Sequence, residues 1–254
     1  MDNRFETLGT ILFVGVGQMG FAIASALVAQ KDFDAHQLVL LDHHPERLSH
    51  FADLGATIVR DMQEACTYEP NTVVLAIKPQ HLEAFLDEHK VALADKLIIS
   101  IAVGLTIASL QKHLGKQSRV VRVMPNLPAK IGLGASLICP SKEADATDIA
   151  AVQALFDAAG TSLIIEEGKF DAAGVLNGCT PAFFALIIDA FTHEAVKLGV
   201  NAQSARELLL QTMAGTARIL QEEKIHPRAF AEQVSSPAGT TIAGVDVLNN
   251  NVEI

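Results

Sequence analysis

Three glycines near the amino terminus have the spacing of a turn that binds phosphate. Gly15, Gly17 and Gly20 form G-x-G-x-x-G, directly after the apolar run 11–14 and before the apolar stretch 21–29. In such a turn the first glycine permits a tight bend, the second lets the backbone approach a pyrophosphate, and the third lets a helix pack closely on a sheet. Free amides at the start of that helix would bind the phosphates. The pattern therefore predicts a dinucleotide site.

An acidic residue follows at the position expected for such a site. Asp42 ends a second apolar run, about 20 residues beyond the glycines. In NAD enzymes an acid there hydrogen-bonds the adenosine ribose and repels a 2′-phosphate. We therefore expect NADH to be used at least comparably to NADPH. His43 and His44 could approach a 2′-phosphate, or they are solvent-facing loop histidines. A glycine turn in an ordinary α/β domain is the alternative, and it leaves the register of Asp42 unexplained.

Three further clusters lie at the ends of predicted elements. Lys78 and Pro79 follow the strand-like run 72–77, at the edge where parallel sheets bind ligands, although a solvated loop lysine also fits. Asn126 stands between two prolines after another such run, where an Asx turn and a substrate contact both fit. Segment 235–241 offers hydroxyls and amides before a predicted helix, which suits a carboxylate or an ordinary N-cap.

The composition fits a soluble protein of two domains. A chain of 254 residues with 50% apolar and 19% charged residues can bury a large core. A net charge of −10 argues against nucleic acid or an anionic membrane as a partner. The cysteines Cys66, Cys139 and Cys179 have no pattern, so we expect reduced thiols in a cytoplasmic protein without a metal site. No leader pattern and no stretch of membrane-spanning length is evident.

The chain changes character once along its length. Up to about residue 166, short β-branched runs alternate with helical stretches, which predicts an α/β fold with a parallel sheet and crossover helices. Beyond it we expect helices only, from Pro181 to about Leu198 and from about Ala202 to Glu223, the second capped by Asn201 or Ser204. The first has an apolar face broad enough for a subunit interface as well as a core. The predicted domains are residues 1–166, doubly wound, and residues 167–254, smaller and all-α.

Together these clusters resemble the motifs of the pyrroline-5-carboxylate reductase family, in order and over essentially the whole chain. That family has a glycine turn with Met beside its last glycine, then A-V-K-P, R-x-M-P-N-x-P, S-G-S-G-P-A-Y, and H-P followed by S-P-G-G-T-T. The corresponding segments here read GVGQMG, AIKP, RVMPNLP, NGCTPAF, and HP followed by SSPAGTT. The H-P pair is His226 and Pro227, which favours a structural turn there.

The resemblance implies both a fold and an activity. It implies a Rossmann domain followed by a helical domain that interlocks with its partner, in a homodimer or a higher oligomer built from dimers. It also implies hydride transfer from NADPH or NADH to the C=N carbon of 1-pyrroline-5-carboxylate, which gives L-proline in the last step of proline biosynthesis. The cofactor supplies the chemistry, so no metal or Ser-His-Asp set is needed.

The resemblance further implies the site residues. Thr241 would hydrogen-bond the ring nitrogen of the imine, and Glu167 matches an acid that reaches the substrate site; with Lys78 they are the expected catalytic residues. The expected carboxylate-binding residues are Ser236, Ala238, Gly239, Thr240 and Thr241. The expected nucleotide-binding residues are Gly15, Val16, Gly17, Gln18, Met19, Gly20, Asp42, Ala76, Ile77, Lys78, Pro79, Ile101, Ala102 and Val103.

Three departures from the family pattern stand out. Segment 177–180 reads NGCT in place of S-G-S-G, so we expect a neighbouring helix to approach this segment less closely. Ala238 replaces a glycine and would pinch its loop if that position needs a positive φ. The sequence stops at VLNNNVEI, where the family continues through a further helix, so we expect exposed apolar surface or a weaker dimer.

Two other functions stay open on this reading. One is a truncated paralogue that binds nucleotide without turnover. The other is a related imine or β-hydroxyacid oxidoreductase, since GVGQMG also resembles the turn of β-hydroxyacid dehydrogenases. Those enzymes use a lysine on the helix after the cofactor domain, and NGCTPAFFALIIDAF contains none.

Overall fold

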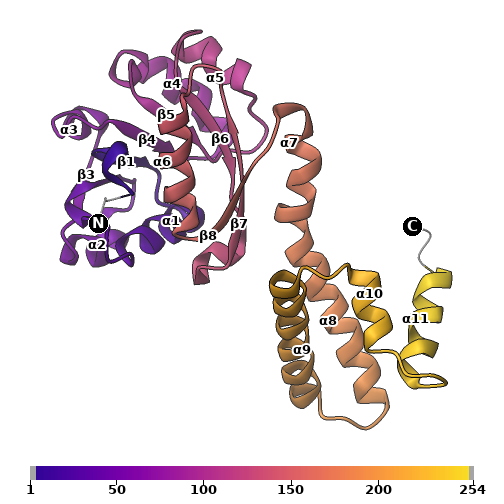
Figure 1. Ribbon diagram of the computed structural model, residues 1–254. Helices are drawn as coiled ribbons and strands as arrows, with labels where there is room; N and C mark the ends of the chain where they lie inside the picture. Colours follow the sequence, from indigo (N-terminus) through magenta and orange to yellow (C-terminus); the bar gives the residue numbers. More distant parts are fainter. Residues whose placement is uncertain (1–3, 252–254) are drawn as a thin grey trace. The chain divides into compact units, whose positions relative to one another are not determined.

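The chain divides into two compact units, Met1–Pro181 and Ala182–Ile254, and the computed structural model describes residues 4–251 of it. The first unit is a sheet covered by helices and the second is helical, as Figure 1 shows for each unit. The predicted boundary after residue 166 falls between the last strand and the helix that follows it. It stays a prediction.

Eight strands form one sheet in the order β3-β2-β1-β4-β5-β6-β7-β8. They are β1 (Ile11–Val14), β2 (Leu38–Leu41), β3 (Thr57–Val59), β4 (Thr72–Leu75), β5 (Leu97–Ser100), β6 (Val120–Met124), β7 (Gly134–Pro140) and β8 (Gly160–Ile164). The first six are parallel, with the order that leaves a switch point between β1 and β4. The Rossmann-type doubly wound arrangement is confirmed.

One strand direction differs from the prediction. β7 runs antiparallel to β6, so the expected all-parallel sheet is wrong at this point. Only a short 3₁₀ segment, Leu127–Ile131, lies between the two strands, and a parallel return would need a crossover of a dozen or more residues. β8 then pairs parallel to β7 after a helical connection.

Helices cover both faces of this sheet because its strands are apolar on both sides. On β1, Ile11 and Phe13 point into one apolar cluster and Leu12 and Val14 into another. The first cluster is completed by α1 (Gln18–Val28), α2 (Ser49–Asp53) and α6 (Ala146–Asp157). The second is completed by α3 (Met62–Cys66), α4 (Pro79–Leu93) and α5 (Ile107–Leu114).

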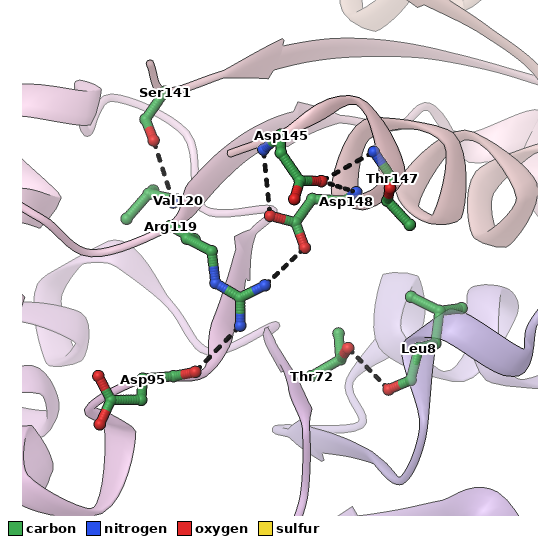
Figure 2. Close-up of polar contacts among 9 residues, drawn as sticks. All are labelled: Leu8, Thr72, Asp95, Arg119, Val120, Ser141, Asp145, Thr147 and Asp148. Carbon is green, nitrogen blue, oxygen red and sulfur yellow. Dashed lines mark hydrogen bonds and ion pairs between the residues drawn. The ribbon is translucent and has the colours of Figure 1, made fainter. Parts of the chain in front are cut away.

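Polar contacts close the edge where the parallel strands begin (Figure 2). Arg119 donates to the Asp148 carboxylate at 2.7 Å and to the Asp95 carbonyl at 3.0 Å. The Thr72 hydroxyl donates to the Leu8 carbonyl at 2.9 Å. Asp148 is buried and also belongs to a capping box at the start of α6. These contacts occupy the amino edge of the sheet, which leaves the carboxyl edge for a ligand.

The remaining helices follow β8 without any further strand in the described residues. They are α7 (Glu167–Gly174), a π-helical turn (Val175–Cys179), α8 (Thr180–Lys197), α9 (Ala202–Glu223), α10 (Pro227–Gln233) and α11 (Thr240–Asn251). The two predicted long helices are confirmed to within a residue or two. Asn201 is the cap of α9, because its side chain accepts hydrogen bonds from the amides of Gln203 and Ser204.

The second unit buries very little of itself. Among its described residues only Thr192 and Ala205 are buried. Large apolar side chains are exposed along α8, among them Phe183 at 52%, Leu186 at 68% and Phe191 at 54%. Phe191 belongs to the apolar face that the sequence pattern predicted, as do Phe184 and Ile187, which are 49% and 46% exposed.

One helical run contradicts the expectation that no stretch reaches membrane-spanning length. The run Glu167–Lys197 has 31 residues and contains an 18-residue window with a mean hydropathy of 1.5, which is long and apolar enough by length and composition alone. A helix that packs against protein in a soluble domain meets the same criterion, so the run carries no assignment by itself. The expectation about a missing last helix concerns the chain beyond residue 251, outside the described residues.

Candidate active site

The glycine turn has the close approaches that its spacing predicts. Gly15 has a φ of 85°, and a Cβ added there would lie 2.8 Å from Cγ2 of Ile77. A Cβ added at Gly20 would lie 2.7 Å from the Gly15 carbonyl oxygen. Gly17 is the N-cap of α1 and faces open space, and no side chain in the described chain caps this helix. The first amides of α1, from Gln18 onward, are therefore available to a phosphate.

Asp42 is tied to this turn. Its Oδ2 accepts the Val16 amide at 2.6 Å and its Oδ1 accepts the His44 amide at 2.8 Å. The Val16 amide is thus held by a carboxylate, so the free amides lie further along, at the start of α1. Each carboxylate oxygen can accept a second hydrogen bond, which leaves acceptor capacity for ribose hydroxyls.

The ends of β4 and β5 bring the other predicted nucleotide segments to the same edge. The Ala76 amide donates to the Val14 carbonyl at 2.8 Å, and the Ile101 amide donates to the Leu75 carbonyl at 3.1 Å. Lys78 is the exposed N-cap of α4 and Pro79 is its first residue, as predicted. Ala102 is half-buried and Val103 is exposed. The glycine turn, residues 76–79 and residues 101–103 therefore share one edge of the sheet.

Glu167 lies in an ion pair that the sequence did not predict. Its Oε1 accepts Nη1 of Arg122 at 2.8 Å and the amide of Ile107, the first residue of α5, at 2.7 Å. The Arg122 side chain is only 6% exposed and its guanidinium lies 4.3 Å from the centre of the Phe170 ring. The signal in the sequence was a lone arginine inside the apolar run 120–124. Glu167 therefore joins β6, α5 and α7, and its expected catalytic role stays a prediction.

The same carboxylate affects a neighbouring thiol. Burial raises the pKa of Cys139, and the negative charge of Glu167 raises it further while Arg122 opposes this. The thiol is protonated at neutral pH and is a poor nucleophile. Within residues 4–251 no group of three His, Cys, Asp or Glu side chains could hold a metal ion.

Asn126 does not form the Asx turn, which was one of the two roles predicted for it. Its side chain gives no cap to the 3₁₀ segment that follows it, and it instead contacts the Ala135 amide and the Asn177 carbonyl. Asn177, which the sequence singled out only as a departure from the family pattern, is buried beside it. These two side chains lie at the carboxyl end of β6.

The predicted carboxylate loop lies in the second unit. Ala238 has a φ of 58°, so this alanine does occupy the left-handed region where the family motif has glycine. The Gly239 amide donates to the Ser236 carbonyl at 3.0 Å, and α11 begins at the next residue, Thr240. Ser236 and Ala238 line a cavity of about 480 Å³ together with Arg228. Thr240 and Thr241 lie in the first turn of α11 and are exposed.

Comparisons with known proteins match both units. The family model described as pyrroline-5-carboxylate reductase dimerisation matches residues 167–253, and that of NADP oxidoreductase, coenzyme F420-dependent, matches residues 10–104. A curated pyrroline-5-carboxylate reductase of Methanosarcina acetivorans is 35% identical over 93% of this chain and 88% of its own length.

Solved structures give the same result. A pyrroline-5-carboxylate reductase from Coxiella burnetii has a TM-score of 0.90 and 30% identity, with 96% of this chain and 91% of that chain covered. A Plasmodium falciparum pyrroline carboxylate reductase with NADP bound has a TM-score of 0.83 and 28% identity, with 95% and 90% covered.

The ion pair predicts a specific loss of stability. In Glu167→Gln the amide oxygen still accepts the Ile107 amide, but the buried Arg122 charge keeps only Asp171, 3.6 Å away and mostly exposed. We expect the free energy of unfolding to fall by about 1 to 3 kcal/mol. Urea denaturation measures it. Glu166→Gln is the matched control, because Glu166 pairs with Lys169 on the surface and should matter little. Equal midpoints for both variants would contradict the assignment.

The positive φ of Ala238 predicts that glycine at this position stabilises the protein. In Ala238→Gly the relief of about 1 to 2 kcal/mol of backbone strain is offset by about 0.5 to 1 kcal/mol of added freedom in the unfolded chain. We expect a net stabilisation of about 0.5 to 1 kcal/mol, read from the thermal midpoint. Ala243→Gly, in the interior of α11, is the control and should destabilise by about 1 kcal/mol. The same sign for both variants would show that Ala238 is not strained.

Proposed function

The chain belongs to the pyrroline-5-carboxylate reductase family. We propose that it carries out the family's reaction, the reduction of 1-pyrroline-5-carboxylate to L-proline with NADPH or NADH, through its glycine turn and through segment 235–241, which we call the Thr241 loop. The main support for this proposal is the match to a curated reductase over 93% of the chain, which includes the glycine turn and the Thr241 loop. A β-hydroxyacid dehydrogenase is supported by the glycine turn alone and lacks its lysine in NGCTPAFFALIIDAF, and a paralogue without turnover has no observation in its favour.

The residues at the carboxyl edge of the sheet fit a dinucleotide. The uncapped start of α1 offers amides to a pyrophosphate, and the open space at Gly17 lets the phosphates approach the backbone. Asp42 offers carboxylate oxygens to the adenosine ribose. Residues 76–79 and 101–103 would line the groove towards the nicotinamide. When bound, the reduced nicotinamide supplies a hydride to the C=N carbon.

The Thr241 loop would hold the imine. Its hydroxyls and the free amides at the start of α11 suit a carboxylate, since they donate hydrogen bonds without an opposing charge. We assign Ser236, Ala238, Gly239 and Thr240 to the carboxylate and the Thr241 hydroxyl to the ring nitrogen. The Thr241 interaction changes as that nitrogen becomes an amine, and this is the condition for a contribution to kcat.

We also assign a homo-oligomeric, cytoplasmic state. The family match to a dimerisation domain and the exposed apolar side chains of α8 support an assembly of identical chains. The three free cysteines support a reducing compartment.

Thr241 gives the test of this function. Loss of one hydrogen bond to the reacting nitrogen costs about 1 to 3 kcal/mol, or roughly 10- to 100-fold in rate. Thr241→Ala should therefore lower kcat/KM for 1-pyrroline-5-carboxylate by that factor, while nucleotide affinity stays within about twofold. The rate is measured as the oxidation of NADH. Thr240→Ala tests the register. A larger loss at Thr240, or full turnover in both variants, would refute the assignment.

Asp42 gives the test of cofactor choice. The wild-type protein should use NADH at least comparably to NADPH, because the Asp42 carboxylate repels a 2′-phosphate. Asp42→Asn keeps an oxygen for the Val16 amide and removes the charge, so the ratio of kcat/KM for NADH to that for NADPH should fall about tenfold. Glu46→Gln, an exposed charge change nearby, is the control. A strong NADPH preference in both wild type and Asp42→Asn would show that other groups set the choice.

A further inference from the structure

Two buried asparagines connect three parts of the first unit at the carboxyl end of β6. Nδ2 of Asn177 donates to the Met124 carbonyl at 2.6 Å and to the Ala135 carbonyl at 3.0 Å. Asn126 returns two bonds: its Oδ1 accepts the Ala135 amide at 2.8 Å and its Nδ2 donates to the Asn177 carbonyl at 3.1 Å. Asn126 is 9% exposed and Asn177 is 7% exposed. We call this pair the asparagine clasp.

The clasp sits where the helical run after α7 changes its geometry. Asn177 is in the π-helical turn Val175–Cys179, and such turns in α-helices are frequent at functional sites. Both neighbouring glycines face Met124, since a Cβ added at Gly174 would lie 2.7 Å from its Sδ and one at Gly178 would lie 3.1 Å from its Cε. The turn therefore holds the end of β6 through the Met124 side chain and through its carbonyl.

The segment that leaves the clasp borders the proposed cofactor groove. After Asn126 the chain forms the 3₁₀ segment Leu127–Ile131, which packs against α1, the helix that starts at the glycine turn. Nζ of Lys130 lies 3.5 Å from Oε1 of Gln18 at the start of that helix. The adjacent strand, β5, ends at Ser100 and is followed by residues 101–103, which are proposed to lie beside the nicotinamide. A shift of Asn126 would therefore move the wall of the groove.

The side chain of Asn177 is held through its amide hydrogens and not through its oxygen. Its Oδ1 is buried and accepts no hydrogen bond from any described residue, while both of its amide hydrogens are used. A buried carbonyl without a partner destabilises a fold, and an alanine would remove Oδ1 but would also take the Nδ2 donor from the carbonyls of Met124 and Ala135. We infer that the role of Asn177 is to fix the positions of the Met124 and Ala135 carbonyls, to which Nδ2 donates.

We propose that the asparagine clasp is a positioning device of the reductase: Asn177 and Asn126 fix the end of β6 and the segment 127–131, and thereby hold the nicotinamide end of the groove in the geometry for hydride transfer. This inference rests on the proposed function. Neither asparagine is assigned a contact with the cofactor, and the affinity for nucleotide is assigned to the glycine turn and Asp42.

The test separates positioning from binding and from folding. Asn177→Ala removes both bonds of Nδ2, and Asn126→Asp keeps the bond from the Ala135 amide while losing the one to Asn177. In each variant we expect kcat per bound cofactor to fall by about 10- to 100-fold. We expect the Kd for NADH, titrated by its fluorescence, to stay within about threefold. The emission of bound NADH should shift towards that of free NADH, because the reduced ring is held less firmly.

Asn71→Ala is the matched control. The exposed Asn71 side chain accepts a hydrogen bond from the Thr10 amide at 3.1 Å, at the opposite edge of the sheet, so its loss should lower the thermal midpoint and leave kcat and NADH emission unchanged. Should Asn177→Ala prove unstable, Asn126→Asp carries the same test. Unchanged kcat and emission in a folded variant, or a loss of activity matched by an equal loss of bound cofactor, would overturn the proposal. Emission and Kd are measured without the imine, so they test the clasp even if the wild type fails to reduce it.

Discussion

The hydrogen bond from the Val16 amide to Asp42 is the interaction on which the first unit's ligand edge depends. It joins the ends of β1 and β2 at 2.6 Å, directly after the left-handed bend at Gly15. Because the carboxylate holds the turn, the following amides are directed outward at the start of α1. The same carboxylate lies where an adenosine ribose is expected. One side chain thus contributes both to the shape of the turn and to the charge beside it.

The fold was largely readable from the sequence because its signals are local. Short apolar runs predicted the alternation of strands and helices up to about residue 166, and Asn201 and Pro79 marked helix starts. The direction of β7 was missed because a strand's composition carries no information about its direction. The information lay in the connection 125–133, which is too short for a crossover helix.

In the candidate site, too, the sequence predicted what depends on neighbouring residues and missed what depends on distant ones. The glycine turn and residues 76–79 were predicted because the residues that cooperate are consecutive. The pairs Arg122 with Glu167 and Asn126 with Asn177 are separated by 45 and 51 positions, and only the folded chain brings them together. Ala238 is intermediate: the resemblance showed that glycine was expected, and only the backbone showed that φ is positive.

The exposed face of α8 has a consequence for the energetics of folding. A unit that buries only Thr192 and Ala205 among its described residues gains little of the hydrophobic free energy that normally offsets chain entropy. Its order must therefore come largely from association with another apolar surface. In the proposed homo-oligomer that surface belongs to another copy of the chain, so by mass action the population of the folded helical unit depends on the concentration of the protein itself. Dilution would act on this unit much as a denaturant does, while the sheet, with its own core on both faces, would be insensitive to it.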